Sequence, residues 1–386
     1  MKHWVFKASA VAALAGVTSS TKCANPATPI ATGPKLGAYN TSATIPWATL
    51  QTFDSANPSV DFTLYNPGAP ADAQGARFTR CAVDTGSTSL VLPARRLDRE
   101  LYESSTEQGY MFYTSNDRLS IGKWMNQTIV FNTTSAIQLK GTVPVLAIAR
   151  QCICHGWKLQ EDGYDCPDSK RQGPWIERNR IGIYMMGVGF GSKSDPAGVF
   201  GWDKNTFLNV LPDDAHPGPF RKGWILDETG ATLGLTELNT DRFLWAPLRR
   251  SYPDATLDWQ RLEGVIKVND LPELNSTSTL IDSGINTMIL TAPADYAVPL
   301  NEEGNITLGT HINVKFGPRH AHIGEITYTI GSQAPYQPAK DTTIKPRIGV
   351  EGPGIGRVNT GIRAMKLYHL AFDAEEGFYG MRRRET

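Results

Sequence analysis

Two stretches of this sequence repeat one pattern. The first is CAVDTGSTSLVLP at residues 81–93, and the second is TLIDSGINTMILTAP at residues 279–293. Each has an apolar run, then Asp-Thr-Gly or Asp-Ser-Gly, then a second apolar run that ends at Pro. A lone Asp-Thr-Gly is a common turn, but two copies in the same setting indicate an internal duplication. The separation of Asp84 from Asp282 is about one domain length.

The composition agrees with two packed units rich in turns. The chain has 386 residues, of which 40% are hydrophobic, together with 36 Gly and 25 Pro. Short β-branched and aromatic runs bounded by turn residues occur at 60–65, 127–131 and 143–148. One short helix is expected at 203–211. These patterns predict an all-β protein. The formal net charge of +0 gives no electrostatic reason to expect a nucleic-acid partner.

The N-terminal residues predict export. Lys2 and Lys7 precede an apolar run at 8–17 that is shorter than the roughly 20 residues of a membrane span, so residues 1–20 are expected to be a signal peptide. Residues 21–44 would be a short leader. Five Asn-x-Ser/Thr sequons are candidate glycosylation sites: Asn40, Asn126, Asn132, Asn275 and Asn305. We therefore expect a secreted, extracellular protein without a membrane anchor.

In an oxidising compartment, the cysteines are expected to form disulfides. The candidates are Cys81, Cys152, Cys154 and Cys166, and a link from Cys152 or Cys154 to Cys166 is one option. The cluster of 152–155 with Cys166 could also be interpreted as a metal site. We favour the disulfide and expect neither a metal nor a cofactor. The two histidines of His320-Ala321-His322 are expected on a solvated strand face.

The duplicated motif resembles that of the pepsin-like aspartic proteases. Further stretches similar to the family are MMGVGF at 185–190, GWILD at 223–227, YHLAFD at 368–373 and GFYG at 377–380. The resemblance implies a bilobal fold with two β-barrel-like lobes and a central cleft. Residues 45–238 would form the N-terminal lobe and residues 239–386 the C-terminal lobe.

The resemblance also implies the chemistry. Asp84 and Asp282 would face each other and share a proton, because two adjacent carboxylates cannot both ionise readily. One carboxyl would then act as a base on water and the other as an acid. Such a pair titrates as a unit.

Residues around the two Asp have roles in the family. Thr85 and Ser283 would brace the two loops through their hydroxyl groups. Gly86 and Gly284 would leave room for the substrate backbone, and Ser87 would hydrogen-bond the outer oxygen of the first Asp. Each could instead be ordinary turn chemistry.

A hairpin carrying a Tyr covers the cleft in the family. Tyr113 is the best candidate for this residue and Tyr110 is the second. The alternative is an exposed hairpin with a surface Tyr.

Several positions depart from the family pattern. Ile285 stands where the second motif often has Thr or Ser, so it cannot hydrogen-bond Asp282, and weaker stabilisation of that carboxylate is expected. Val91 replaces a Trp that supports the hairpin Tyr. Residues 358–361 (VNTG) replace an apolar-apolar-Gly-Asp run, and Ile362 stands where that Asp would be. The leader is also short and poor in basic residues for a pro-segment.

Two functions follow. The first is a secreted aspartic-type endopeptidase that hydrolyses an extended peptide or protein substrate as a monomer. The second is a catalytically inactive pepsin-like protein that acts as a binding protein or inhibitor. The departures favour the second, whereas the presence of both Asp, both hydroxyls and both Gly favours the enzyme.

Overall fold

The computed structural model describes residues 32–53, 56–70, 72–113, 116–191, 201–216, 218–253, 256–332, 344–349 and 352–385. Within these residues strands dominate, and the two α-helices, α1 (Arg99–Ser104) and α2 (Leu159–Asp162), are short. The predicted all-β class is therefore confirmed. The signal peptide expected at 1–20 lies outside the described residues.

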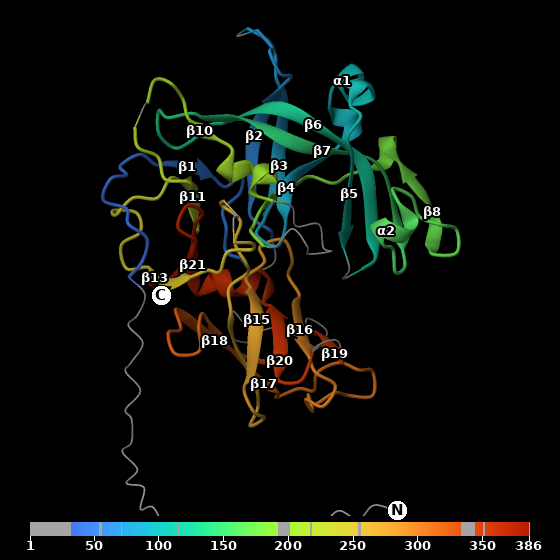
Figure 1. Ribbon diagram of the computed structural model, residues 1–386, viewed down its shortest axis with the longest axis vertical. Helices are drawn as coiled ribbons and strands as arrows, with labels where there is room; N and C mark the ends of the chain where they lie inside the picture. Colours follow the sequence, from blue (N-terminus) through green and yellow to red (C-terminus); the bar gives the residue numbers. More distant parts are fainter. Residues whose placement is uncertain are drawn as a thin grey trace, which may run out of the picture. The chain divides into compact units, whose positions relative to one another are not determined.

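Most of the first half of the chain forms a nine-stranded sheet (Figure 1). Its main path runs β10-β7-β4-β9-β3-β2-β6-β5, and β8 pairs with β7. The strands are β2 (Ser59–Tyr65), β3 (Ala76–Asp84), β4 (Thr88–Pro93), β5 (Gln108–Tyr113), β6 (Arg118–Phe131), β7 (Leu139–Cys154), β8 (Arg171–Glu177), β9 (Met185–Val188) and β10 (Leu211–Pro212).

A seven-stranded sheet in the second half runs β18-β17-β14-β15-β20-β16-β19. Its strands are β14 (Gly264–Val268), β15 (Leu274–Leu280), β16 (Met288–Ala292), β17 (His311–Phe316), β18 (Gly324–Thr329), β19 (Ile344–Ile348) and β20 (Ile355–Asn359).

The two sheets repeat one strand order. The path β7-β4-β9-β3-β2 in the first matches β19-β16-β20-β15-β14 in the second. The pairings along both paths are parallel, antiparallel, parallel and antiparallel, in that order. Each Asp motif lies at the end of the corresponding strand, β3 or β15. The sequence repeat is therefore accompanied by a repeat of topology.

A six-stranded sheet combines strands from both halves of the chain, in the order β1-β12-β11-β21-β22-β13. They are β1 (Ala43–Pro46), β11 (Gly223–Leu226), β12 (Gly230–Leu233), β13 (Leu244–Pro247), β21 (Tyr368–Asp373) and β22 (Phe378–Arg383). β1 begins two residues inside the segment expected to be a leader. One contiguous hydrophobic cluster includes Phe131, Phe316 and Phe372, one from each sheet, so the three sheets share a core.

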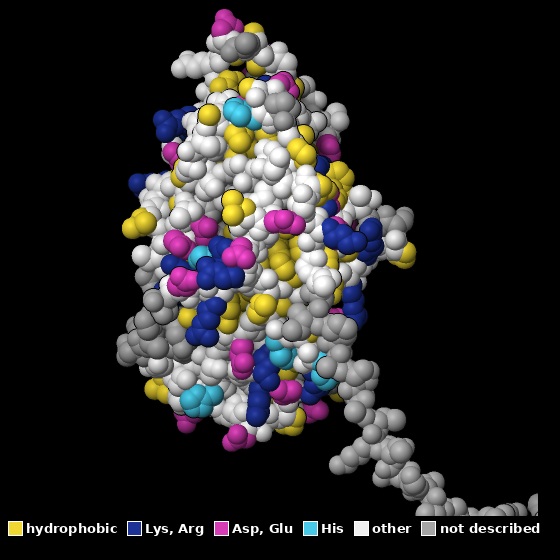
Figure 2. Space-filling view, turned by 90° about the vertical axis from the view of Figure 1, so that its left-hand side faces the viewer, with side chains coloured by type: hydrophobic (Ala, Val, Ile, Leu, Met, Phe, Trp, Pro, Cys, Tyr) yellow, Lys and Arg dark blue, Asp and Glu magenta, His cyan; other side chains and the backbone are white. Residues whose placement is uncertain are grey.

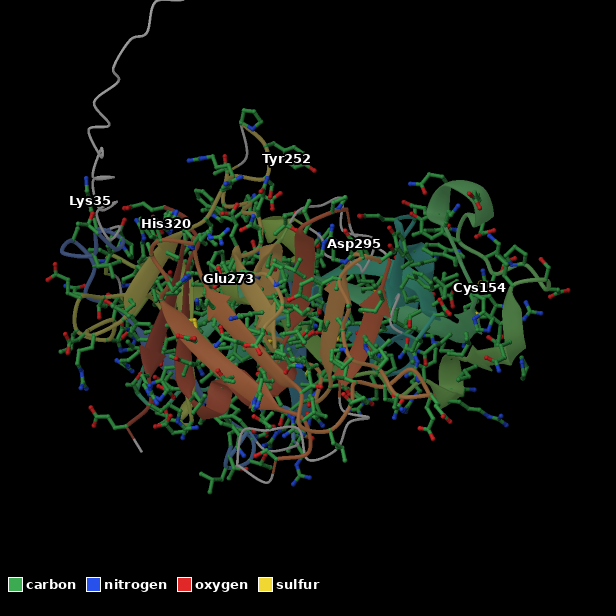
Figure 3. The ribbon with its side chains drawn as sticks, turned by 90° about the horizontal axis from the view of Figure 1, so that it is seen from below. Lys35, Cys154, Tyr252, Glu273, Asp295 and His320 are labelled. Atoms are coloured by element: carbon green, nitrogen blue, oxygen red, sulfur yellow. A yellow bond between two sulfur atoms is a disulfide. The ribbon has the colours of Figure 1, made fainter. Side chains whose placement is uncertain are left out.

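A disulfide joins Cys154 to Cys166. This bond closes the loop that carries α2, and Figure 3 shows Cys154 among the green loops, away from His320 and Glu273. The expectation of a disulfide at Cys81 and Cys152 is wrong, because the structure gives both as free, buried thiols. Cys81 lies within the core strand β3, and Cys152 packs in a small apolar cluster beside the disulfide. Burial raises the pKa of Cys152 to about 11.

Two local expectations from the sequence differ from the structure. Residues 320–322 lie in the turn between β17 and β18, not on a strand. The helix expected at 203–211 is replaced by two 3-10 turns, Trp202–Lys204 and Thr206–Leu208. The buried Asn205 caps the second turn through the backbone N–H groups of Phe207 and Leu208, and such local side-chain bonds compete with a continuous helix.

No helix among the described residues is long and apolar enough to cross a membrane. On the face in Figure 2, Lys and Arg side chains lie among Asp and Glu side chains.

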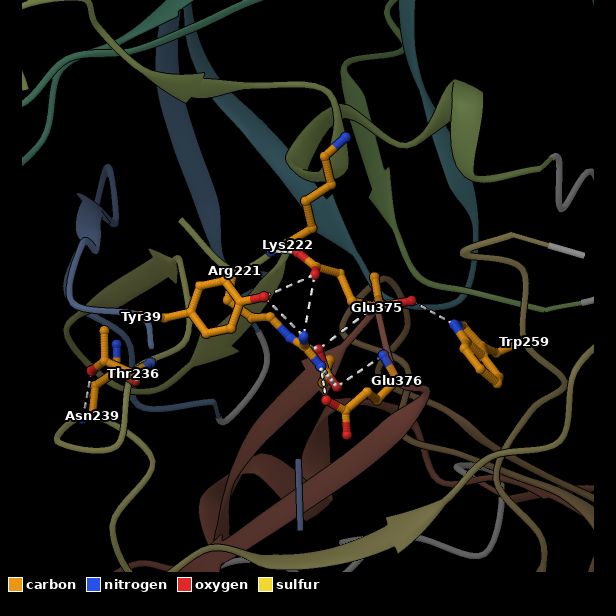
Figure 4. A network of polar contacts seen from close by, with 10 residues as sticks. Tyr39, Arg221, Lys222, Thr236, Asn239, Trp259, Glu375 and Glu376 are labelled. Atoms are coloured by element: carbon orange, nitrogen blue, oxygen red, sulfur yellow. Dashed lines mark hydrogen bonds and ion pairs between the residues drawn. The ribbon is translucent and has the colours of Figure 1, made fainter. Parts of the chain in front are cut away.

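An ion-pair network lies at the six-stranded sheet (Figure 4), and its central pair, Arg221 and Asp373, is buried. Arg221 donates two hydrogen bonds of 2.8 Å to Asp373, and it also pairs with Glu375 at 3.1 Å and Glu376 at 3.0 Å. Tyr39 accepts a further bond from Arg221 at 3.3 Å. Burial raises the pKa of Asp373, and the bonds from Arg221 oppose this effect. The guanidinium therefore holds three carboxylates at the end of β21 and in the turn that follows it.

Replacing Arg221 with Met should lower the free energy of unfolding by about 3–5 kcal/mol, because Asp373 would remain as an uncompensated buried charge. Urea denaturation measures this change. Arg99→Met is the control, since Arg99 forms an ion pair with Glu103 and its side chain is 83% exposed. Its cost should stay under about 1 kcal/mol. Equal effects of the two substitutions would contradict the role of Arg221.

Candidate active site

The two Asp motifs occupy equivalent places in their sheets. Asp84 is the last residue of β3, and Asp282 lies two residues beyond the end of β15. We call residues 84–87 the first Asp loop and residues 282–285 the second Asp loop. β9 passes beside the first loop and β20 beside the second, each between the two strands that flank the loop.

The structure brings the carboxyl groups of Asp84 and Asp282 together. They hydrogen-bond each other and are only 5% and 7% exposed. Gly86 faces the carboxyl group of Asp282, and Gly284 faces that of Asp84. A Cβ atom at either glycine would clash with the carboxyl group of the opposite loop. The absence of a side chain at both positions therefore permits this approach.

Thr85 and Ser283 connect the two loops by reciprocal hydrogen bonds. The Thr85 hydroxyl donates to the Ile281 carbonyl oxygen, and the Ser283 hydroxyl donates to that of Val83, both at 2.6 Å. Each hydroxyl also accepts a bond of 3.0 Å from the backbone N–H of the other residue. All four bonds are buried, so they are protected from competition with water.

Asp84 receives two hydrogen bonds from its own loop. The Gly86 N–H donates to Oδ1 at 2.7 Å, and the Ser87 hydroxyl donates to Oδ2 at 2.6 Å. These donors hold the plane of the carboxyl group and leave its orientation little freedom.

Asp282 has an equivalent pair of donors from two different segments. The Gly284 N–H donates to Oδ1 at 2.8 Å, and the side-chain amide of Asn359 donates to Oδ2 at 2.6 Å. Ile285 indeed supplies no side-chain bond. The side-chain amide of Asn359, at the end of β20, donates in place of the missing hydroxyl. Weaker stabilisation of the Asp282 carboxylate stays a prediction.

The surroundings of the site raise the pKa of two of its groups, Asp282 and Tyr113. Burial and, next, the charge of Asp84 raise the pKa of Asp282 well above its ordinary value, although the Asn359 bond opposes this shift. Burial and the charges of both Asp also raise the pKa of Tyr113. Two adjacent carboxyl groups of this kind favour a state with one shared proton.

Tyr113 lies at the end of β5, in the hairpin formed with β6. Its hydroxyl contacts the Met185 sulfur at 2.8 Å. Tyr110 lies on the opposite face of β5 and packs on Trp157, with ring centroids 4.8 Å apart. Of these two tyrosines, only Tyr113 has a pKa that the charges of the Asp pair raise. Met185, rather than a residue at position 91, provides the contact for its hydroxyl.

The turn of this hairpin is attached to the disulfide-closed loop. Asp117 accepts a bond of 2.7 Å from the Cys154 backbone N–H, and its carboxylate contacts the His155 ring at 2.9 Å. This link could not be predicted from the sequence, because the paired residues are distant along the chain.

Other groups surround the loops. Asn57 donates to the Gly284 carbonyl oxygen at 2.8 Å, and Arg261 contacts that of Gly86 at 3.5 Å. Neither residue was predicted, since no motif marks it. Among the described residues, no cluster of three His, Cys, Asp or Glu side chains could hold a metal ion.

The five sequon asparagines lie apart from the site. Asn40, Asn126, Asn132 and Asn275 are exposed, and Asn305 is half-buried. Four of them are thus accessible to a glycosylating enzyme, whereas glycosylation itself remains a prediction.

Comparisons with known proteins give no family assignment: no protein-family model and no curated protein matches this chain.

The raised pKa of Asp282 predicts a pH-dependent gain in stability for Asp282→Asn. Below the unfolded-state pKa of about 3.9, both folded and unfolded wild type are protonated at this residue, so the variant should gain nothing. As the pH rises, only the unfolded state ionises freely, and wild type loses stability until the pH passes the folded-state pKa. The variant avoids this loss and should therefore be more stable than wild type at pH 7.

Thermal unfolding at pH 3 and pH 7 measures this difference. Asp270→Asn is the control, because Asp270 is exposed. An Asp282→Asn variant that is equally or less stable than wild type at pH 7 would contradict the assignment.

Proposed function

We propose that this chain is a secreted aspartic-type endopeptidase of the pepsin-like kind. The observation that carries the proposal is the hydrogen-bonded pair of Asp84 and Asp282, with each carboxyl group held by its own two donors. The repeated strand order supports the accompanying proposal of two lobes, residues 45–238 and 239–386, with the pair in a cleft between them.

The pair can supply acid and base at the same pH. In the resting state one proton is shared between the carboxyl groups. The ionised carboxylate takes a proton from a water molecule, whose oxygen forms a bond to the carbonyl carbon of the substrate. The protonated carboxyl group gives its proton to the carbonyl oxygen. This produces a tetrahedral diol.

Collapse of the diol restores the pair. The carboxyl group that gained the water proton gives it to the amide nitrogen, and the C–N bond breaks. A diol hydroxyl returns its proton to the other carboxylate as the C=O bond reforms. One proton again remains on the pair, and peptide and water have become an acid and an amine without a metal or other cofactor.

The surrounding residues fit this chemistry. The buried bonds of Thr85 and Ser283 hold the two loops in register, which pre-organises the carboxyl groups before the substrate binds. The β5–β6 hairpin carries Tyr113, which we propose covers the bound peptide and limits access of bulk water. An extended peptide or protein is the substrate class, and a monomer suffices because both Asp come from one chain.

Cleavage of a denatured protein by the purified chain, measured from acid to neutral pH, tests the proposal. Wild type should cleave, and a transition-state-mimic inhibitor of aspartic proteases should block it. Asp84→Asn and Asp282→Asn should each lower kcat by about 10³-fold or more, because neither variant can carry acid and base together.

Asp270→Asn serves as the control for these substitutions and should cleave like wild type. Absence of inhibitor-sensitive cleavage by folded wild type would overturn the proposal and favour an inactive binding protein. Unchanged cleavage by Asp84→Asn would also overturn it.

A further inference from the structure

The outer oxygens of the two Asp are held by different chemistry. Asp84 receives the hydroxyl of Ser87, which lies three residues after it in the same loop. The third residue after Asp282 is Ile285, which has no hydroxyl. Asp282 instead receives the amide of Asn359, which is 77 residues away along the chain.

The strand register explains why Asn359 can reach this place. In the first half, β9 places Met185 beside Ala82 and Val91, which lie two residues before and seven residues after Asp84. In the second half, β20 places Asn359 beside Leu280 and Ile289, at the same offsets from Asp282. Asn359 is therefore the equivalent of Met185.

The Met185 position already lies next to the outer donor. Its sulfur is 3.9 Å from the Ser87 hydroxyl, which itself bonds Asp84. A side chain that projects from the equivalent place in the second half needs only a polar end to bond the carboxyl group directly. Asn359 has that polar end.

The geometry fixes the orientation of the Asn359 amide. Its oxygen accepts a bond of 2.9 Å from the Gly361 N–H, so the nitrogen must be the atom that faces Asp282 at 2.6 Å. β15 and β16 hold the backbone of Asn359 from both sides. The donor is therefore fixed before any substrate binds.

We propose that Asn359 is the positioning residue of Asp282, that it replaces the missing loop hydroxyl, and that it keeps Oδ2 of Asp282 free of the shared proton. This inference rests on the proposed function.

An amide nitrogen and a hydroxyl differ in what they allow. A hydroxyl can rotate and either donate or accept, so Ser87 tolerates Asp84 Oδ2 with or without a proton. The Asn359 nitrogen can only donate, so it favours an unprotonated Oδ2. The shared proton is then confined to the side of Asp282 that faces Asp84. The two carboxyl groups are thereby made unequal by a residue outside both loops.

Within the part of the chain that the structure describes, few other charged groups face this bond. Asp84 lies opposite on the first Asp loop, Tyr113 faces both Asp from the β5–β6 hairpin, and Arg261 contacts the first loop from the segment before β14. On β20 itself, Arg357 is exposed. Because Asn359 is neutral, a substitution at this position should change the protonation of Asp282 and leave these charges in place.

The test compares three variants with wild type. Asn359→Leu removes the donor with little change in volume, Asn359→Leu/Ile285→Ser moves a hydroxyl donor to the position equivalent to Ser87, and Ile285→Ser is the matched control. Two readouts are measured: the pH dependence of kcat/KM, and the titration of the Asp282 carboxyl carbon by ¹³C NMR.

Loss of the donor should move both the Asp282 titration and the pH profile upward by about one pH unit, because a hydrogen bond to a charged group has that order of effect. We expect kcat to fall about 10-fold or more, with a smaller change in KM. The double variant should recover most of both shifts. The double variant, like Asn359→Leu, also lacks the side-chain bond to the Gly361 N–H. Its recovery would therefore identify the loss of the donor to Asp282, and not the loss of the Gly361 bond, as the cause.

An Asn359→Leu variant with an unchanged titration and pH profile would overturn the inference, as would a double variant that shows no recovery. If Asn359→Leu does not fold, Asn359→Met provides the side chain found at the equivalent position, and the same outcomes apply to it. If wild type has no peptidase activity, the proposed function fails, whereas the NMR titration still decides whether Asn359 controls Asp282.

Discussion

The reciprocal hydrogen bonds between Thr85 and Ser283 are the interaction on which this structure depends. They join two loops that are distant in sequence and bring two buried carboxyl groups into hydrogen-bond contact. Such a pair is unfavourable by itself, because burial and mutual repulsion both oppose ionisation. The loops must therefore be held by bonds that water cannot replace. The four buried bonds meet this need, and the two glycines allow the close approach.

Much of this arrangement could be predicted from the sequence because it is local and duplicated. An apolar run, Asp, a hydroxyl residue and Gly occur in both halves, so the candidate pair could be predicted from the motif. The all-β class could be predicted from the short β-branched and aromatic runs between turn residues. The bonds of Gly86, Ser87 and Gly284 are also local, since each donor lies within three residues of its Asp.

The parts that could not be predicted depend on strand register. Asn359 is a departure from an apolar pattern when the sequence is considered alone, and only the pairing of β20 with β15 and β16 shows that it reaches Asp282. The choice of Cys154 over Cys152 for the disulfide likewise depends on the position of each residue along β7. An amide side chain directly after Val358, where the family pattern has an apolar residue, was nevertheless a signal that could have been followed.

The two halves of the repeat thus differ in which residue supplies the side-chain donor to the Asp, but each half has one. The first half has a loop hydroxyl with Met185 beside it, and this Met also contacts the hairpin residue Tyr113. The second half has an apolar loop residue with Asn359 beside it. Each carboxyl group retains one backbone donor and one side-chain donor, although the side-chain donor comes from a different element. The pattern of donors to the two carboxyl groups is therefore more symmetric than the residues that supply them.

The most direct measurement is the ¹³C NMR titration of the Asp282 carboxyl group in wild type and in Asp84→Asn. The account predicts that Asp282 of wild type titrates well above the ordinary Asp value of about 3.9 and that its pKa falls in the variant, because the neighbouring charge is gone. A titration of Asp282 in the ordinary range in both proteins would show that the two carboxyl groups are not coupled and would contradict the account.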